Sequence, residues 1–447
     1  MTEQLNIAII GAGVAGMAAA WDLTRAGHRV HIYEAGDRVG GLAAGFKEAD
    51  WDWTLEKFYH HWFEGDHHML KLIEEIGHSD KVIFKRPKTS FWVDGEVVRS
   101  EIEPISVLML PMSLRGKLQF MLGGAFVKLF PNWRMFEQHT ADAWMRRYMG
   151  EEGYERFFKT LLMGKFGTYY DQVNMAWMWS RVQARSLKLG TFEGGFQNFL
   201  DLLGEAITQK GAEIHLNTRV EQIDVVQHHP TLTINGETHS FDRVISTTSP
   251  RIMLKMTPRL DDTTYGDQME ALKSIGGLCV VFALKHELIG DDTYWLNLPA
   301  VSPDYQDNAF PYLALVEHTH FMDRSHYNGD HIIYCGDYVE TDHDYFQWDD
   351  ERLYEHFLPS LKQVNPNFER DWVRKWWVFR APYAQPIPQV NHSQHIPDLQ
   401  TPLPGVIWAS MSQVYPWDRG TNYSVEMGRR VARIVLGQET RTRAVID

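Results

Sequence analysis

Six residues near the amino terminus have the composition of a nucleotide-binding turn. They are Gly11, Ala12, Gly13, Val14, Ala15 and Gly16. The glycines permit a tight turn that brings a pyrophosphate close to backbone N–H groups at the positive end of the following helix. By itself a GxGxxG run is weak evidence, because a strand–helix unit without a ligand also uses glycine at its turn.

Glu34 supplies the second part of a dinucleotide site. It ends a predicted strand, Arg29–Glu34, 18 residues after Gly16, where a carboxylate can accept hydrogen bonds from ribose hydroxyls. The same carboxylate would repel a 2′-phosphate, which disfavours NADP. Strand, glycine turn, helix and acid together favour a bound dinucleotide over a turn without a ligand.

The segment Tyr33–Leu42 contains this acid followed by a DRVGGL run. It resembles the flavoenzyme superfamily of flavin-containing amine oxidases, protoporphyrinogen oxidases and phytoene desaturases, with UDP-galactopyranose mutases more distant. The resemblance implies FAD as the cofactor, and it continues at Gly194–Phe196, Thr218–Val220 and Tyr415–Arg430. The residues that it assigns to FAD in these segments, beyond the first turn, are Glu34, Ala35, Arg38, Gly40, Gly41, Leu42 and Val220.

The carboxyl-terminal segment departs from the family pattern at one position. Family members often end an apolar strand with Gly-Asp, whereas this chain has Ser410 after Trp408-Ala409, so a hydroxyl stands where the resemblance implies a carboxylate. Downstream, the resemblance implies that Gly420, Thr421 and Asn422 begin a helix that faces the flavin pyrimidine. Backbone N–H groups there would stabilise negative charge, and a helix cap made by Thr421 or Asn422 is compatible with this role.

The chain has no second dinucleotide motif and no CxxxxC pair. Electrons are therefore expected to enter FAD from an organic substrate and to leave to oxygen or a quinone, as in an oxidase or a desaturase. Two alternatives remain open at this point. One is a mutase that acts on a nucleotide sugar and needs only reduced flavin, and the other is a flavin-binding protein without catalysis.

Residues 56–68 are unusually rich in histidine and aromatic side chains. On a helix, His60 and His67 would be separated by a rise of roughly 10 Å, and no HExxH spacing occurs, so we expect no metal site. The position of the segment resembles the place where family members pass an aromatic and histidine-containing strand over the flavin. Tyr59, His60 and His61 are therefore candidates for the flavin face, the alternative being hydrogen-bonded, partly buried histidines.

A substrate-facing segment is implied at Tyr383–Pro388, which resembles the part of the family that precedes the final FAD motif. Tyr383 and, just before it, Arg380 are the candidates for contact with a small-molecule substrate. Lys165 lies in a glycine-flanked segment that resembles one in protoporphyrinogen oxidases.

Residues 104–136 combine apolar and basic side chains. Leu108, Met109, Leu110, Leu114 and Phe126 lie among four basic residues, Arg115, Lys117, Lys128 and Arg134. This composition suits a peripheral membrane contact or the entrance to a channel for a lipophilic substrate, and it also suits the core of a helical lobe.

These residues require a particular arrangement of elements. Residues 1–70, 189–250 and 402–447 contain separate α/β patterns, each too short for a complete sheet, which predicts one discontinuous Rossmann-like FAD-binding domain. Residues 71–188 and 251–401 are predicted to form a substrate domain, helical in its first part and mixed β/α in its second. The expected fold class is α/β, or α+β for the whole chain.

The amino-acid composition limits the kinds of molecule that this protein is expected to bind. The 447 residues include 44 basic and 58 acidic side chains, so no net basic surface is available for nucleic acid. The two cysteines, Cys279 and Cys335, lie in apolar runs, which favours a reducing compartment. We expect no signal peptide and no transmembrane helix, and a cytoplasmic protein that is either free or peripheral to the inner face of the membrane. Oligomeric state is left open.

Overall fold

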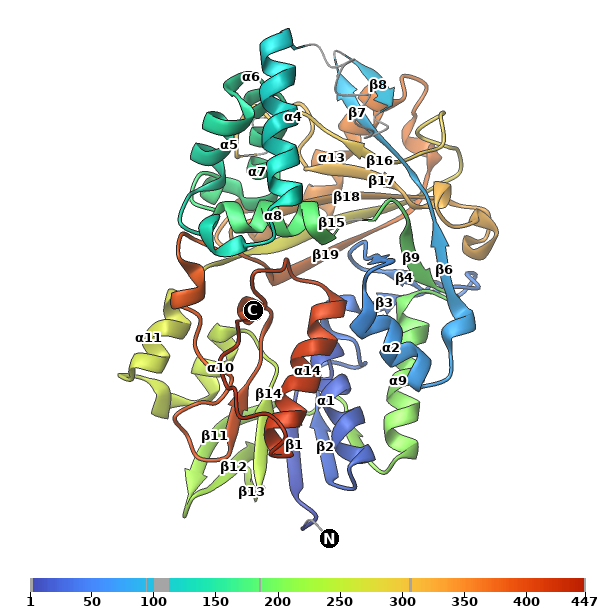
Figure 1. Cartoon of the computed structure of the whole chain (residues 1–447). Helices are drawn as coiled ribbons and strands as arrows, with labels where there is room; N and C mark the ends of the chain where they lie inside the picture. Colours follow the sequence, from blue (N-terminus) through green and yellow to red (C-terminus); the bar gives the residue numbers. More distant parts are fainter. Residues whose placement is uncertain (1–2, 94, 100–111, 185, 305–307, 446–447) are drawn as a thin grey trace.

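The computed structural model describes residues 3–93, 95–99, 112–184, 186–304 and 308–445. Figure 1 shows a parallel sheet with its helices in the lower half and a larger mixed sheet beside a group of helices in the upper half. The candidate site residues come from both halves, so the way in which the two halves meet determines the chemistry.

The lower sheet has five parallel strands in the order β10-β2-β1-β14-β20. Its strands are β1 (Asn6–Ile10), β2 (Arg29–Tyr33), β10 (Glu213–His215), β14 (Arg243–Ser246) and β20 (Val406–Trp408). Ile7, Ala8 and Ile9 have no exposed surface, because layers cover both faces of the sheet. This burial explains why β1 is an apolar run without alternation.

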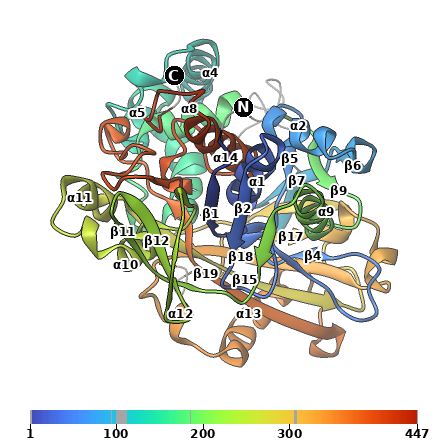
Figure 2. The same ribbon diagram turned by 90° about the horizontal axis from the view of Figure 1, so that it is seen from below.

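Helices cover one face of this sheet, and a small antiparallel sheet covers the other (Figure 2). The helices are α1 (Val14–Arg25), α9 (Phe196–Gln209) and α14 (Thr421–Val435). The opposite layer contains β11 (Val220–Val226), β12 (His229–Ile234), β13 (Glu237–Ser240), α10 (Pro250–Met256) and α11 (Thr264–Ala271). The last helix lies directly on the first, since a Cβ atom built on Gly428 would be 2.2 Å from the carbonyl oxygen of Ala15.

The upper sheet has seven strands in the order β19-β15-β18-β17-β16-β7-β8. They are β7 (Lys88–Val93), β8 (Glu96–Arg99), β15 (Ser274–Leu284), β16 (Thr293–Asn297), β17 (Ala314–Glu317), β18 (His331–Val339) and β19 (Val373–Pro386). Alternate residues of β15 face opposite cores. Leu278 and Val280 pack toward α13 (Asp350–Val364), which α12 (Asp344–Gln347) precedes, whereas Cys279 and Val281 pack toward Trp51.

A helical lobe stands beside the upper sheet (Figure 1). It contains α4 (Leu114–Leu129), α5 (Ala141–Met149), α6 (Glu151–Gly153), α7 (Lys159–Phe166) and α8 (Met175–Ala184). The remaining elements lie between the two halves and are α2 (His67–Glu75), the paired β3 (Gly45–Phe46) and β4 (Leu55–Glu56), and the sheet of β5 (Trp62–Phe63), β9 (Leu189–Phe192) and β6 (Val82–Lys85). Two of these, β4 and β5, flank Tyr59, His60 and His61.

The predicted fold class is confirmed: a Rossmann-like parallel sheet is combined with helical and mixed-sheet insertions. Of the apolar segment at 104–136, the residues Leu108, Met109 and Leu110 lie outside the described part of the chain. Within the described part, no helix has both the length and the apolar character that crossing a bilayer requires.

Candidate active site

The glycine turn connects β1 to α1 with little room for side chains. Gly11 has φ +102°, a conformation that favours glycine, and a Cβ atom on Gly16 would lie 2.1 Å from the carbonyl oxygen of Gly11. No side chain caps the first turn of α1, whose N-cap residue is Gly13. The first N–H groups of this helix are therefore available to an anion.

Glu34 lies beside this turn at the end of β2. Its carboxylate accepts hydrogen bonds from the backbone N–H groups of Ala12 and Gly36, both at 2.8 Å, and Ala35 links the acid to the second of these residues. Each carboxylate oxygen retains a lone pair for a further donor. The arrangement fits an acid that orients the turn and still binds ribose hydroxyls.

The second glycine pair lies against the first turn. The N–H of Gly40 donates to the carbonyl of Ala12 at 2.8 Å, and a Cβ atom on Gly41 would come within 3.3 Å of the Cα atom of Gly13. The neighbouring Leu42 is 38% exposed. The structure thus brings these predicted cofactor residues together at one end of β1.

Two other predicted FAD contacts lie farther along this region. The side chain of Arg38 donates to the carbonyl of Gly45 at 3.0 Å and pairs with Asp37 at 3.2 Å. Val220 begins β11 and is buried, directly after a loop in which the Thr218 N–H donates to the carbonyl of Glu34 at 2.8 Å. The nucleotide roles of both residues remain predictions.

The N-cap residue of α14, Gly420, provides no side-chain cap, and the same holds for the N-cap residues of α2 and α9. The side chains of Thr421 and Asn422 do not cap α14, because they bind outward: Thr421 Oγ1 accepts from Trp62 Nε1 at 3.0 Å and Asn422 Oδ1 from the Met69 N–H at 3.1 Å. By contrast, serine, threonine or aspartate caps α4, α5 and α13. The open helix end fits a partner that carries negative charge.

Ser410 and Tyr383 meet between β20 and α14. The hydroxyl of Tyr383 lies 3.0 Å from Ser410 Oγ and 2.6 Å from Ser412 Oγ, and it accepts from the Ser412 N–H at 2.9 Å. Ser410 also caps the short helix that follows it. The hydroxyl in place of the usual carboxylate is therefore committed to local bonds, and its contact with FAD remains a prediction.

Tyr59, His60 and His61 lie between the two halves of the molecule. Tyr59 packs edge-on to Trp295, His60 Nδ1 lies 2.5 Å from the carbonyl of Phe58, and His61 binds the hydroxyl of Tyr294. Burial lowers the pKa of His60 to about 4 and that of His61 to about 3. Both imidazoles are therefore neutral near pH 7, which fits hydrogen-bonded positioning groups better than acids.

Arg380 lies away from the other candidates. Its guanidinium donates to the carbonyls of Tyr345 and Trp348 at 3.2 and 2.7 Å and pairs with Asp350 at 2.6 Å. These partners belong to α12 and α13 or the turn between them, on the face of the upper sheet opposite to Tyr59. The structure does not bring Arg380 together with Tyr383.

A charged cluster lies next to Tyr59 and was not assigned as a unit from the sequence. We call it the cationic cluster, and it consists of Lys165, Arg181, Tyr338, Asp418 and Arg419. Lys165 Nζ donates to the Tyr338 hydroxyl at 3.3 Å, Arg419 binds the same hydroxyl, and Arg181 pairs with Asp418 at 2.9 Å. Lys165 was noted in the sequence for its glycine neighbours, but Tyr338 and Arg419 carried no signal that would link them to it.

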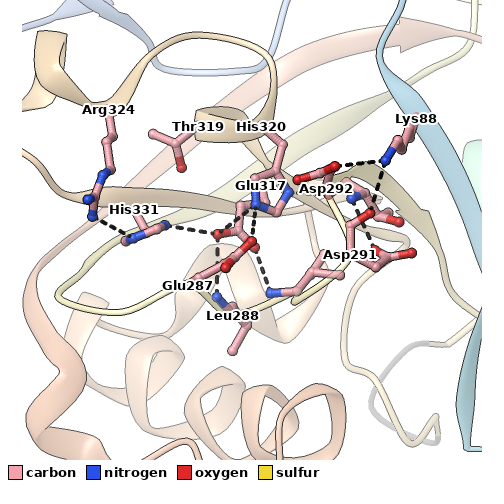
Figure 3. Close-up of polar contacts among 12 residues, drawn as sticks. Lys88, Glu287, Leu288, Asp291, Asp292, Glu317, Thr319, His320, Arg324 and His331 are labelled. Atoms are coloured by element: carbon pink, nitrogen blue, oxygen red, sulfur yellow. Dashed lines mark hydrogen bonds and ion pairs between the residues drawn. The ribbon is translucent and has the colours of Figure 1, made fainter.

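A second buried polar cluster lies where β17 ends and β18 begins (Figure 3). We call it the carboxylate cluster, and at its centre is Glu317, which has no exposed surface. Its oxygens accept from the N–H groups of Leu288 and Ile289 at 3.3 and 2.7 Å. His331 Nδ1 and His320 Nε2 lie 3.3 and 3.6 Å from the same carboxylate.

In the histidine-rich segment, His60 and His61 have different hydrogen-bond partners, the Phe58 carbonyl and the Tyr294 hydroxyl. Among the described residues, one set of metal-ligand types does converge, His31, Glu213 and His215 at the edge of the parallel sheet. Arg29 also binds this glutamate, at 3.3 Å. The group lies beside the second strand of the nucleotide-binding unit, where the Glu34 N–H donates to the carbonyl of His215 at 2.9 Å.

The parallel sheet, the glycine turn, Glu34 and the helix ends at Gly13 and Gly420 are the features of a protein that binds a dinucleotide. The donor set fits FAD: N–H groups for a pyrophosphate, a carboxylate for a ribose, and a helix end for the pyrimidine side of the ring.

Comparison with known proteins agrees. A family model described as flavin containing amine oxidoreductase matches residues 14–436. The 15-cis-phytoene desaturase of Glycine max is 25% identical over 251 residues, which cover 50% of this chain but only 43% of that enzyme. Reduced UDP-galactopyranose mutase has the same fold, with a TM-score of 0.76 and 17% identity over 99% of this chain and 96% of that one. Cyclohexylamine oxidase from Brevibacterium oxydans has a TM-score of 0.72 and 15% identity over 98% and 99%.

The chain therefore belongs to the flavin-containing amine oxidoreductase family. The predicted family resemblance and the predicted FAD cofactor are both confirmed.

Proposed function

We propose that this chain is an FAD-dependent oxidase or desaturase that removes a hydride from an organic substrate with an apolar body, and that oxygen or a quinone is the final acceptor. The pair of uncapped helix ends, at Gly13 and Gly420, carries the proposal. One is suited to a pyrophosphate and the other to the electron-accepting end of the same cofactor.

FAD, when bound, supplies the two-electron acceptor. The chain holds it through the N–H groups of the glycine turn, through Glu34, and through the N–H groups of Gly420, Thr421 and Asn422. Because these donors are fixed by α1 and α14, they need no reorganisation as negative charge develops. The neutral His60 and His61, with Tyr59, would cover the side of FAD away from the α14 helix end and exclude water there.

An aromatic group near the start of α14 supports an apolar substrate body. Trp417 stacks on Tyr423, with ring centres 5.7 Å apart and planes 8° from parallel, and Trp179 lies 5.6 Å from Trp417. Flat aromatic faces bind unsaturated or cyclic groups by offset stacking. Tyr383, on the other side of Ser410, remains our candidate for substrate contact.

A peripheral membrane contact is part of the proposal and rests on α4. Four leucines of this helix lie on its exposed side, with exposed fractions of 85% for Leu114, 54% for Leu118, 62% for Leu122 and 81% for Leu129. Apolar side chains on one helix face beside lysine and arginine suit an anionic lipid surface. Sedimentation with anionic vesicles tests this contact, and Leu118→Glu should abolish it.

The main test is anaerobic reduction. The purified protein should be yellow, and a substrate should bleach the flavin without NAD(P)H, with peroxide formed on admission of air. Activity only after prior reduction, with no net redox change, would instead support a mutase, and a flavin that no substrate bleaches would support a binding protein without catalysis.

A further inference from the structure

The cationic cluster brings three basic side chains together around one hydroxyl and one carboxylate. Lys165 comes from α7, Tyr338 from β18, and Arg419 from the residues just before α14. Besides the Tyr338 hydroxyl, Arg419 donates through Nε to Gln385 Oε1 at 2.8 Å. The ammonium of Lys165 also lies 4.4 Å from the centre of the Tyr338 ring.

The charges of this cluster do not balance. Burial would raise the pKa of Asp418, but Lys165, Arg181 and Arg419 outweigh it and hold the pKa at about 2, so the carboxylate is ionised. Its oxygens are already used, Oδ2 by Arg181 at 2.9 Å and Oδ1 by the backbone N–H of Arg419 at 3.0 Å. Neither the Lys165 ammonium nor the Arg419 guanidinium forms an ion pair with any carboxylate in the ranges that the structure describes.

The cluster is also deep without being closed. Burial lowers the pKa of Lys165 to about 8, which requires surrounding protein, yet Lys165, Tyr338 and Arg419 each keep part of their accessible surface. That combination is typical of groups that line a binding site rather than a packed core. A largely enclosed cation without a counter-charge is costly, so an arrangement with two of them is best explained by an anion that completes it.

We infer that Lys165 and Arg419 bind an anionic group of the substrate, a carboxylate or a phosphate, next to the open end of α14. This inference rests on the proposed function and narrows it. A cationic amine would be repelled here, and a pure hydrocarbon would leave both cations without a counter-charge. The substrate is thus an acid whose apolar part extends over the aromatic residues that precede and begin α14.

Four ligands that share a benzene ring but differ in charge distinguish anionic, neutral and cationic substrates. The FAD-loaded protein is titrated with benzoate, phenyl phosphate, benzamide and benzylamine, and binding is followed by the change in the flavin spectrum and by the shift of the unfolding midpoint. We expect at least one anion to bind tenfold or more tightly than neutral benzamide, and benzylamine to bind less tightly than benzamide. Tighter binding of benzoate assigns a carboxylate, and tighter binding of phenyl phosphate assigns a phosphate.

Substitutions of Lys165 and Arg419 test whether these two side chains bind the anion. Lys165→Met and Arg419→Met should each lower the affinity for the anion at least tenfold and leave the affinity for benzamide unchanged. Arg419→Lys should recover part of the lost affinity. Lys159→Met, on the same helix but paired with Glu155 at the surface, should bind like the wild type. If a variant does not fold, the wild type still gives a test: anion affinity should fall as pH rises through about 8, where Lys165 loses its proton in the presence of Tyr338, Asp418, Arg181 and Arg419.

Three results would overturn the inference: equal affinity for benzoate, phenyl phosphate and benzamide, an equal loss in Lys159→Met, or ionised tyrosine absorbance at pH 7 that Tyr338→Phe removes. The last result would make Tyr338 the counter-anion. A protein that neither contains nor takes up FAD would refute the proposed function instead, and the unfolding midpoint would still report whether anions bind.

Discussion

The carboxylate cluster is centred on a fully buried group and the cationic cluster keeps some accessible surface, and they also differ in how their charges are partnered. Glu317 in the carboxylate cluster receives two backbone N–H groups and lies beside two histidines, all from the chain itself. Lys165 and Arg419 in the cationic cluster share one tyrosine hydroxyl. A charged group whose hydrogen-bond and ion-pair partners all come from the chain stabilises the fold, whereas a charged group that lacks a counter-charge is available to a ligand.

The largest expected effect is a loss of stability when the central acid of the carboxylate cluster is removed. Glu317→Ala leaves two N–H groups and the histidines without their acceptor, and it should lower the free energy of unfolding by about 3–5 kcal/mol. Urea denaturation of the purified variant measures this loss. Glu287→Ala, which removes only the half-exposed partner of His320, should cost about 1 kcal/mol or less; a similar loss in both variants would contradict the assignment.

Glu34 is an intermediate case, because it has two chain partners and remaining lone pairs. Glu34→Ala should weaken FAD binding by about 1.5–3 kcal/mol, since it removes charge-assisted hydrogen bonds to the ribose. Fluorescence titration of the apoprotein with FAD measures the change. Asp37→Ala, in the same loop and largely exposed, should retain FAD as the wild type does. Unchanged affinity in Glu34→Ala would count against the nucleotide site.

Lys165→Met, in the cationic cluster, should change the free energy of unfolding by less than Glu317→Ala does and in the opposite direction. Replacement of a buried ammonium that has no carboxylate partner by an apolar chain of similar length should leave stability unchanged or raise it by about 1 kcal/mol. Urea denaturation without added ligand gives the value. A loss above about 2 kcal/mol would mean that the ammonium is part of the structural framework.

The smallest effect is a difference in pH dependence. Burial would lower the pKa of His320, but Glu317, the Thr293 carbonyl and Glu287 outweigh it and raise the pKa. Its contribution to stability is therefore lost as pH rises above about 6.5, the ordinary value. Lys165 behaves in the opposite way: with a folded pKa of about 8 and an unfolded pKa of about 10.4, its penalty is relieved as pH rises between them.

Unfolding midpoints of the wild type, His320→Asn and Lys165→Met from pH 5 to 11 separate these two slopes. The slope of each variant's curve should differ from that of the wild type only in its own window, and outside that window the two curves should run parallel. Parallel curves for all three proteins would show that neither group titrates as its surroundings require.

Local patterns predicted the lower half of the molecule well. The turn predicted at Gly11–Gly16 connects the strand Asn6–Ile10 to the helix Val14–Arg25, and the strand predicted at Arg29–Glu34 is Arg29–Tyr33 in the structure. In these elements the period of burial and the glycine turns act over a few residues, so the sequence carries the information directly.

The cationic cluster could not be predicted in this way. Lys165 and Tyr338 are 173 residues apart, and Tyr338 and Arg419 are 81 apart, so only the pairing of β18 with its neighbours and the approach of α7 bring them together. Arg380 is the opposite case, in which residues close in the sequence are separated in the structure. It is three residues from Tyr383 on β19, but strand alternation and the irregular register near Ile275 turn it toward α13.

The close packing of α14 on α1 has a consequence for biosynthesis. The first strand ends at Ile10, whereas β20 begins at Val406 and α14 follows it, so about 400 residues are translated between the two parts of one nucleotide site. At about 5–20 residues per second, a ribosome needs roughly 20–80 s for that interval. During this time the glycine turn is made but the helix that packs on α1 is not, so FAD capture should be a late event that awaits the synthesis of α14.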